Sequence, residues 1–279
     1  SVADSFKELE ARGFEVVTLN ADEKGYINLE ELEREVDENT ILVSIMYVNN
    51  EVGTVQPIEK MAEIIKSKNK NCIFHTDCVQ AFGKHPINGR HFDAISVSGH
   101  KIHCPKGVGV LYLRKGVRAK NLHFGGGQEK GFRPGTENTG SIVAMGLGAE
   151  IAKRDLEKNF EKVKAVKEKL MTICDILPDV YVNGDSENGS PYILNLSFEG
   201  VKGEVLLHAL ENYEIYVATG SACSSRAKEK KKIVDYLIDG RGSSTVRFSF
   251  DCENTVEEAE KAIEVLKEQV PMLRMFQPR

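Results

Sequence analysis

Residues 41–48 read ILVSIMYV, and two further apolar runs of the same kind follow, NCIFHTD (71–77) and DAISVS (93–98). Runs that are apolar almost throughout, instead of alternating with polar residues, are typical of strands buried on both faces of a sheet. The helix-like segment EKMAEIIKSK separates the first two runs, and strand–helix–strand order predicts right-handed crossovers and a mostly parallel sheet. A fourth run, VGVLYLR (108–114), follows after the short link CPKG, which could make the last pair antiparallel.

Helices are predicted before and after these strands. Residues 1–12 read as an amphipathic, charged helix, and Phe14–Leu19 as a short strand. Asn28 is expected to cap the next helix, with Glu31 three residues later as the reciprocal partner of a capping box. After a glycine-rich loop, a helical stretch dense in Lys and Glu is expected from about Ser141 to Cys174.

The pattern changes beyond Pro178 and indicates a second, smaller unit. YILNLSF, the helix-like GEVLLHALE, IYVATG and TVRFSF precede a last helix, which carries a Thr255/Glu258 capping box and apolar residues at helical spacing. The predicted fold class is therefore α/β. A large domain over residues 1–148 is built on a mostly parallel sheet, and a smaller α+β C-terminal domain covers residues 149–279.

Composition and charge exclude several classes of function. Of the 279 residues, 41% are hydrophobic and 28% charged, as in ordinary globular domains, and the net charge of −5 argues against nucleic acid as a main partner. No apolar run reaches the length of a membrane span. The six cysteines, at positions 72, 78, 104, 174, 223 and 252, form no CxxC pair. Neither a metal site nor a disulfide framework is expected, and reduced thiols favour a cytoplasmic protein.

Polar residues stand where three of the predicted strands end. They are Asn49-Asn50-Glu51, then Asp77 with Gln80, then Ser98-Gly99-His100-Lys101. One such residue alone is usually a turn or helix cap. Three sets at one edge of an open α/β sheet are typical of a ligand site. A lysine that forms a Schiff base, a carboxylate for a pyridine nitrogen and Ser or His side chains for a phosphate together favour pyridoxal phosphate chemistry.

The chain also resembles a known family. VSIMYVNNEVGTVQPI, HTDCVQAFGK, SVSGHKIHCPKGVGVLY, GGGQEKGFRPGTEN, ATGSACSS and VRFSF are similar, in order and spacing, to the signature blocks of the NifS/IscS-type cysteine desulfurases. These are class V aminotransferase-like, fold-type I enzymes that use pyridoxal 5'-phosphate. The resemblance implies a homodimer that takes sulfur from L-cysteine, leaves L-alanine and passes the sulfur to an acceptor or scaffold protein, in iron–sulfur cluster assembly or thiolation.

The resemblance assigns the cofactor residues position by position. Lys101 matches the Schiff-base lysine, and Asp77 matches the partner of the pyridinium nitrogen. Gln80 matches a group near the phenolic oxygen of the cofactor. Ser98 and His100 match residues that contact the phosphate, and His100 is also a candidate acid and base.

Four more residues are assigned to the substrate, the partner subunit and the sulfur. Asn50 matches a residue near the cofactor and the substrate, and Thr136 matches one that reaches the phosphate of the partner subunit's cofactor. Arg247 matches the clamp for the substrate carboxylate, although an Arg in a strand could also pair with a local Glu. Cys223 matches the nucleophile that carries the persulfide, and a structural thiol is the alternative. The following Lys228-Glu-Lys-Lys-Lys is a solvated face or a surface for an acidic sulfur acceptor.

Several features depart from the family pattern and leave alternatives open. Family members carry an N-terminal segment of roughly 100 residues before the point that matches Ser1, with a phosphate-binding turn and a ring-stacking His. Cys104 and Phe124 stand where the family commonly has Gly and His. The alternatives are a selenocysteine lyase or another class V enzyme, and a cofactor-free, inactive fragment or interaction protein.

Overall fold

The four apolar runs form one sheet, in the order β1 (Leu42–Met46), β2 (Ile73–Asp77), β3 (Ala94–Ser98) and β4 (Gly109–Leu113). This computed structural model describes residues 2–220, 233–238 and 240–276. The pairs β1–β2 and β2–β3 are parallel and β3–β4 is antiparallel, as predicted. The short link before β4 cannot hold a crossover helix, so the chain reverses direction there.

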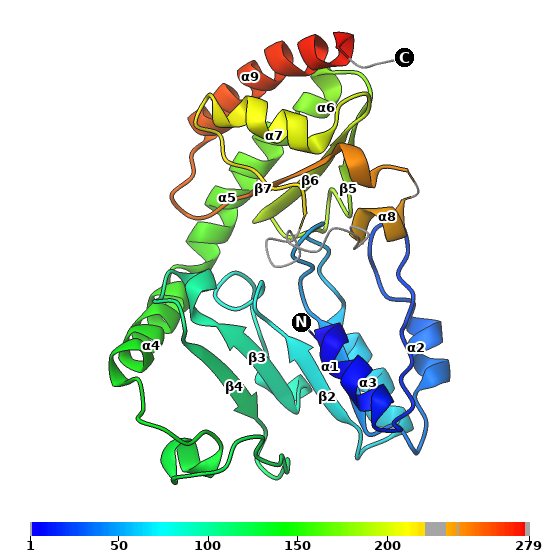
Figure 1. Cartoon of the computed structure of the whole chain (residues 1–279), viewed down its shortest axis with the longest axis vertical. Coiled ribbons are helices and arrows are strands. Elements are labelled where there is room, and N and C mark those ends of the chain that lie inside the picture. The colour runs from blue at the N-terminus through cyan, green and yellow to red at the C-terminus, as the bar shows by residue number, and fades with distance from the viewer. Residues whose placement is uncertain (1, 221–232, 239, 277–279) are drawn as a thin grey trace.

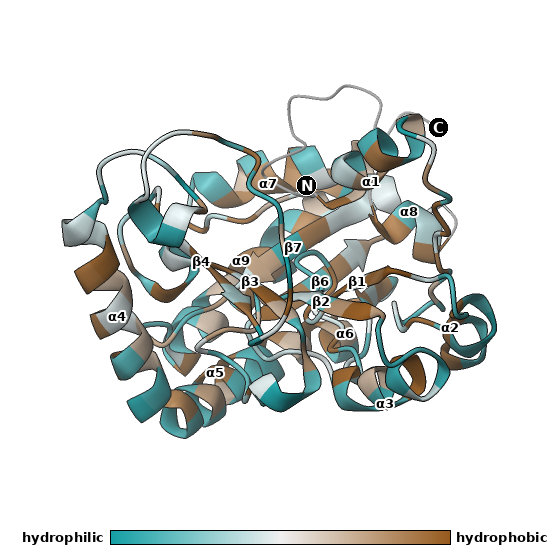
Figure 2. Ribbon diagram, turned by 90° about the horizontal axis from the view of Figure 1, so that it is seen from below, coloured by the Kyte–Doolittle hydropathy of each residue, from teal (hydrophilic) through white to brown (hydrophobic). Residues whose placement is uncertain are grey.

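Helices flank the larger sheet, and some of them contribute residues to its core. They are α1 (Val2–Ala11), α2 (Leu29–Glu35) and α3 (Ile58–Lys68), with the short helices η1 (Gly89–His91) and η2 (Gly99–Ile102) between strands. Met61 and Ile65 of α3 are fully buried in the cluster that contains Phe74 of β2. Figure 2 shows apolar residues concentrated in the strands and more hydrophilic residues on outward turns of the helices.

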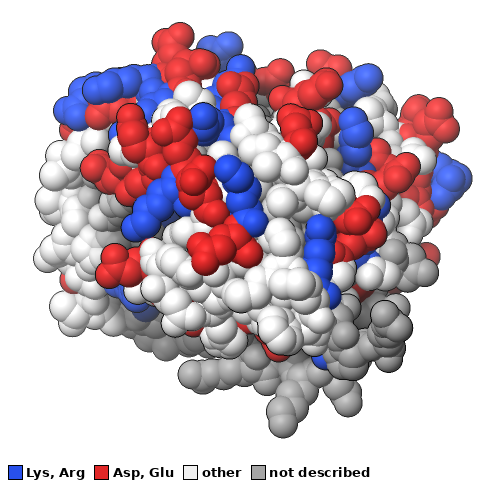
Figure 3. Space-filling view, turned by 90° about the horizontal axis from the view of Figure 1, so that it is seen from above, with Lys and Arg blue, Asp and Glu red and all other residues white. Residues whose placement is uncertain are grey.

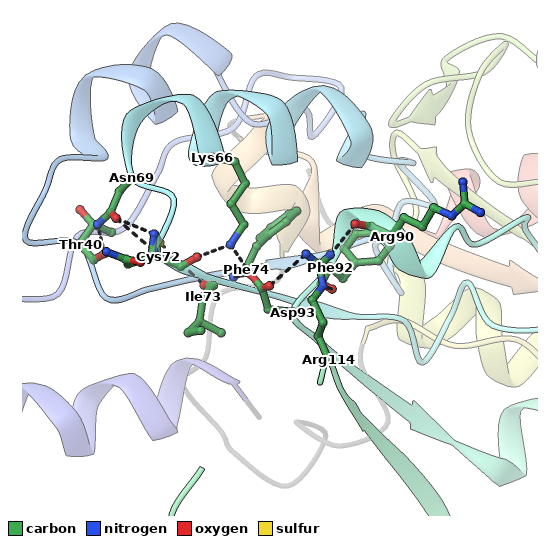
Figure 4. Close-up of polar contacts among 11 residues, drawn as sticks. Thr40, Lys66, Asn69, Cys72, Ile73, Phe74, Arg90, Phe92, Asp93 and Arg114 are labelled. Atoms are coloured by element: carbon green, nitrogen blue, oxygen red, sulfur yellow. Dashed lines mark hydrogen bonds and ion pairs between the residues drawn. The ribbon is translucent and has the colours of Figure 1, made fainter. Parts of the chain in front are cut away.

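A polar network holds the larger sheet at the end opposite the predicted site (Figure 4). The Asp93 carboxylate is buried and lies 2.5 Å from Lys66 Nζ and 3.5 Å from Arg114 Nη1. The same carboxylate accepts a hydrogen bond from Phe74 N at 2.9 Å. Two cations and a main-chain donor satisfy this buried charge, which would otherwise be costly to bury.

The second half of the chain forms a smaller, antiparallel sheet in the order β5–β6–β7. Its strands are β5 (Val180–Asn183), β6 (Ile193–Phe198) and β7 (Thr245–Ser249). The remaining helices are η3 (Gln128–Gly131), α4 (Thr139–Arg154), α5 (Leu156–Met171), α6 (Ile173–Ile176), α7 (Gly203–Glu211), α8 (Ile233–Leu237), η4 (Gly242–Ser244) and α9 (Val256–Met275). Helices α5, α7 and α9 pack on this sheet around a second core. The Thr255/Glu258 capping box is present at the start of α9, as predicted.

Two local predictions are wrong, and a third is refined. Phe14–Leu19 belongs to neither sheet, because no described strand lies beside it to complete a ladder. Asn28 does cap α2, but the Glu31 carboxylate binds the main chain and side chain of Asn20 instead of closing a capping box. The predicted helical stretch Ser141–Cys174 is helical, but it is divided into three helices at Asp155, where the backbone leaves helical geometry, and at Thr172.

The two sheets are arranged so that the carboxyl ends of β1, β2 and β3 face the smaller sheet (Figure 1). Strand β4 runs the other way and forms an edge of the larger sheet, with Val110, Leu111 and Tyr112 all more than 40% exposed. On the face over α7 and α9, Figure 3 shows acidic and basic side chains interspersed. Within the described residues, no helix has the length and apolarity required to cross a membrane.

Candidate functional site

Two neighbouring parallel strands bring the predicted cofactor residues to one edge of the larger sheet. Asp77 is the last residue of β2, and its Oδ1 accepts a hydrogen bond from Val79 N at 2.9 Å. Ser98 is the last residue of β3, and its Oγ lies 2.8 Å from His100 Nδ1. Lys101 follows in η2, which begins directly after β3. The topology therefore places a carboxylate, a hydroxyl, an imidazole and an amine at the same end of adjacent strands.

The turn that carries Lys101 needs a glycine at its start. A Cβ atom on Gly99 would lie 2.8 Å from Val108 Cγ1 and 3.1 Å from the sulfur of Met145 in α4. Real Cβ atoms essentially never approach another atom as closely as 2.8 Å, so any other residue at position 99 would force η2 or Val108 to shift and would crowd α4. This close packing fixes where His100 and Lys101 leave the sheet.

Asn50 and Arg247 meet at this edge although 197 residues separate them. Arg247 lies on β7 and its Nη1 donates a hydrogen bond to the main-chain oxygen of Asn50 at 3.1 Å, while its Nε donates to Ser249 Oγ. Burial lowers the pKa of Arg247, and the carboxylate of Glu51 opposes this shift. The smaller sheet thus contributes a partly buried guanidinium to the strand ends of the larger one.

Lys101 also lines a cavity of about 290 Å³ between η2, α4 and the smaller sheet. Asp77, Ser98, His100 and Asn50 are not in its lining, so this space lies beside the predicted cofactor residues and does not enclose them. Lys84 lines it too, with its Nζ 5.1 Å from the ring centre of Tyr192. Burial and the charge of Lys101 lower the pKa of Lys84 to about 8, against the opposing charge of Asp251.

Of the other predicted site residues, Gln80 follows Asp77 closely, Thr136 lies apart from this group, and the rest lie outside the described residues. Gln80 is partly buried in the turn after β2. Thr136 is exposed in the segment between β4 and α4, which Figure 1 places at the opposite end of the larger sheet. Cys223 and the basic run that begins at Lys228 lie outside the residues that the structure describes.

Two cysteines that flank β2, Cys72 before it and Cys78 after it, are buried and poorly suited to react. Cys72 and Cys78 are fully buried. Burial raises the pKa of the Cys72 thiol and raises the pKa of Cys78 to about 12. Because the thiolate is the reactive form, both residues are core residues, as their place in or beside an apolar strand predicts.

His75 is a strand residue, as predicted from its place in HTD. Its Nδ1 lies 2.7 Å from Ser44 Oγ and its Nε2 lies 2.9 Å from Ser96 Oγ, so it bridges β1 and β3. Burial lowers the pKa of His75, while the charge of Asp77 raises it.

Sequence reasoning missed two residues at the junction of the sheets. Nothing in the sequence marks Lys84 as a residue of the site, because a lysine in a turn is ordinarily solvated. Asn195 does carry a signal: it lies in ILNLSF, where a buried strand would otherwise be apolar, and it is 4% exposed. Its Nδ2 donates a hydrogen bond to the main-chain oxygen of Glu51 at 3.1 Å.

Comparison with known proteins gives matches that run through nearly the whole chain. The family model "Aminotransferase class-V" matches residues 3–262. A protein of Lactobacillus delbrueckii subsp. bulgaricus, described as a NifS/IcsS protein homolog, is 41% identical over 96% of this chain and 71% of its own length. The protein of Pectobacterium carotovorum described as cysteine desulfurase IscS is 40% identical over 100% of this chain and 69% of its own length.

Solved structures agree with these relatives. A structure described as a NifS-like protein superimposes with a TM-score of 0.89 at 37% identity, over 97% of this chain and 72% of that one. A NifS-like protein from Rickettsia africae gives a TM-score of 0.80 at 28% identity, over 90% and 68% of the two chains. The predicted α/β fold with a mixed, mostly parallel sheet is confirmed.

Proposed function

Because the chain belongs to the class-V aminotransferase family, we propose that it is a cysteine desulfurase, which takes sulfur from L-cysteine and leaves L-alanine. Among the observations, one carries this proposal. Asp77, Ser98, His100 and Lys101 lie at one edge of a sheet, and Arg247 enters that edge from the smaller sheet. Such an arrangement offers an amine, a carboxylate and a guanidinium to one small amino acid and its cofactor.

The residues at this edge fit pyridoxal 5'-phosphate. Its pyridine nitrogen requires a carboxylate, and Asp77 supplies one on the last residue of β2. Its phosphate requires hydrogen-bond donors, and Ser98 and His100 supply a hydroxyl and an imidazole 2.8 Å apart. Lys101 would hold the aldehyde, with Gln80 and Asn50 near the phenolic oxygen. When bound, this cofactor withdraws electrons from the α-carbon of an amino acid.

The chain's own residues supply the remaining steps. Arg247 and Asn50 bind the carboxylate of L-cysteine, and an arginine suits this task because its planar fork matches a carboxylate. The Lys101 amine takes the proton from the α-carbon, and His100 serves as an acid and base beside it. The Cys223 thiolate attacks the substrate sulfur, so the carbon–sulfur bond breaks, L-alanine leaves and Cys223 carries a persulfide for an acceptor protein.

We also propose that two copies of the chain form a homodimer in the cytoplasm. Exposed apolar side chains on α4, among them Ile142, Val143 and Leu147, provide a surface for a second copy. Thr136 lies next to this helix and would reach the cofactor of the partner subunit. The five described cysteines carry free thiols, in keeping with a reducing compartment.

Turnover of L-cysteine with added pyridoxal 5'-phosphate tests the proposed reaction. We expect L-alanine and sulfide from the wild-type chain, and visible absorption of the bound cofactor. Lys101→Ala should lose both the absorption and the turnover, whereas Cys223→Ser should keep the absorption and lose sulfide. Lys120→Ala, at an exposed lysine, is the matched control.

Two outcomes would contradict the proposal. Wild-type turnover by Lys101→Ala would remove the lysine from the reaction. Turnover of L-selenocysteine but not of L-cysteine would identify a selenocysteine lyase instead.

A further inference from the structure

A row of polar side chains crosses the smaller sheet on the face turned toward the strand ends of the larger one. Asn183 of β5, Asn195 of β6 and Arg247 of β7 are direct cross-strand partners, so their side chains share one face. Asn183 and Asn195 are 1% and 4% exposed. Ser197 is fully buried two residues along β6, on the same face.

Hydrogen bonds run along this row and end on the larger sheet. Asn183 Nδ2 donates to Asn195 Oδ1 and to Ser197 Oγ, both at 2.8 Å. Asn195 Nδ2 donates to the main-chain oxygen of Glu51 at 3.1 Å, and Arg247 Nη1 donates to that of Asn50, also at 3.1 Å. Two neighbouring side chains of the smaller sheet thus hold two successive carbonyl groups of the turn that follows β1.

The segment that they hold carries one of the proposed substrate residues. It follows β1 and folds on itself, because Asn49 Oδ1 accepts hydrogen bonds from Glu51 N and Val52 N. Further along, the main-chain oxygen of Gly53 accepts a hydrogen bond from Ser190 N at 2.8 Å. The turn, residues 49–54, is therefore bound near one end by side chains of the smaller sheet and near the other by the loop between β5 and β6.

We propose that Asn195 is a positioning residue for the reaction: it fixes the 49–54 turn so that Asn50 and Arg247 keep the spacing that one substrate carboxylate requires. This inference rests on the proposed function. Asn195 touches neither substrate nor cofactor in this role. It acts through the main chain at Glu51, next to Asn50, and its own amide is oriented by Asn183.

A purely structural role for the row is the alternative. A buried amide costs free energy unless it is hydrogen-bonded, and an apolar row of similar volume would hold the strands together equally well. What an apolar row cannot do is bind carbonyl groups on another element and fix its register. If the row only held the strands of the smaller sheet together, Asn195 would not need to bind the main chain of Glu51.

Steady-state kinetics of L-alanine formation separate the two roles. Asn195→Leu removes the donor to Glu51, and Asn195→Ser keeps a polar group but is too short to reach Glu51. For both we expect KM for L-cysteine to rise about tenfold with kcat within about twofold, because substrate positioning is lost while the reacting groups remain. Ser197→Ala is the control, since it removes a hydrogen bond of the same row but leaves the contact with Glu51 in place.

Amide hydrogen exchange supplies a second readout that needs no activity. Both Asn195 variants should exchange the amides of Val52 and Gly53 about tenfold faster than the wild type, and Ser197→Ala should not. Equal KM values for the Asn195 variants and Ser197→Ala, or unchanged exchange in the turn, would overturn the proposal. If the wild type makes no L-alanine, the proposed function fails, and the exchange experiment still decides whether Asn195 holds the turn.

Discussion

At the residue scale, the guanidinium of Arg247 is oriented by the protein before any substrate binds. Its Nε donates to Ser249 Oγ at 3.2 Å and its Nη1 to the main-chain oxygen of Asn50 at 3.1 Å. A guanidinium has five N–H bonds, so these two contacts fix its plane and leave others for a ligand. A lysine ammonium has neither this plane nor this number of donors.

Arg247→Lys should therefore raise KM for L-cysteine by about tenfold or more, because the point charge of lysine cannot replace a forked contact. Steady-state L-alanine formation at varied L-cysteine concentrations measures this. Arg241→Lys is the matched control, since the contacts of Arg241 are with the ring of Tyr181 at 4.2 Å and the carboxylate of Glu199 at 3.7 Å. An Arg247→Lys variant with the wild-type KM would show that another residue binds the carboxylate.

His85 makes the stability of the fold depend on pH. It is 8% exposed, its Nε2 lies 2.8 Å from Ser190 Oγ, and its ring packs edge-on against Phe160 and Tyr192. Burial and the nearby charges of Lys84 and Lys167 lower its pKa to about 4. An unfolded chain, with an ordinary histidine pKa of about 6.5, binds this proton more readily.

The free energy of unfolding should therefore fall as the pH is lowered from about 6.5 to about 4, by up to about 3 kcal/mol from this residue. Above pH 6.5 the histidine is neutral in both states and contributes no slope. Urea unfolding of the wild type and of His85→Gln at several pH values measures the effect. Parallel pH profiles for the two proteins would mean that His85 does not titrate in the folded state as described.

At the element scale, the turn η2 depends on how closely it packs against α4. A methyl group on Gly99 would lie 2.8 Å from Val108 Cγ1, 3.1 Å from Met145 Sδ and 3.2 Å from Cys104 Cβ. Three separate neighbours would have to move, and one of them is on a long helix. Lys101 is two residues away, so a displaced turn would also move the amine.

Gly99→Ala should destabilise the protein by about 1–3 kcal/mol, the usual cost of overpacking, and weaken cofactor binding. Gly146→Ala is the matched control: this glycine lies inside α4 with nothing within 4 Å of an added Cβ, so alanine should stabilise the helix. Denaturant unfolding and the visible absorption of added cofactor measure both effects. A Gly99→Ala protein as stable as the wild type would contradict the packing argument.

The elements that the sequence predicts well are those whose pattern depends on burial alone. Leu42–Met46 and Ile73–Asp77 are flanked by other elements on both faces, so their almost continuous apolar runs predict buried strands correctly. Phe14–Leu19 has a similar pattern, but a strand also needs a neighbour, and a pattern within one segment does not reveal whether one is present. The break at Asp155 was missed because the helical pattern continues on both sides of it.

At the scale of the whole molecule, the proposed dimer depends on apolar side chains along α4. Val143 is 71% exposed, and Ile142 and Leu147 lie on the same helix. The predicted domain boundary at residues 148 and 149 falls within this helix. Because Met145 packs in the core of the larger sheet and Val166 of α5 in the other core, we propose that the domains meet near Asp155.

Val143→Glu should weaken association of the two copies at least about tenfold, because a charge would be buried in the interface. Sedimentation equilibrium measures the dissociation constant. Val205→Glu is the control, at a similarly apolar but 46% exposed residue on α7 of the smaller sheet. Equal dissociation constants for the two variants would place the dimer contact elsewhere.

The site was partly predictable for a reason of topology. Asp77, Ser98 and Lys101 follow neighbouring parallel strands, and such strands end at one edge, so their proximity follows from the sheet order. The contact between Asn50 and Arg247 could not be predicted from the strand order, because it depends on how the two sheets are packed together. The same holds for Asn195, whose partner lies on the other sheet.

The exposed edge at β4 has a consequence for handling the chain. Val110, Leu111 and Tyr112 offer main-chain groups along a border that no described strand completes, and this is the geometry on which cross-β stacks grow. Basic residues flank the run, with Lys106 before it and Lys115 after it, while Arg114 is paired with Asp93. Such gatekeepers repel a second copy by charge, so their protection weakens as ionic strength rises. The chain should therefore stay dispersed at higher protein concentration in low-salt buffer than in high-salt buffer.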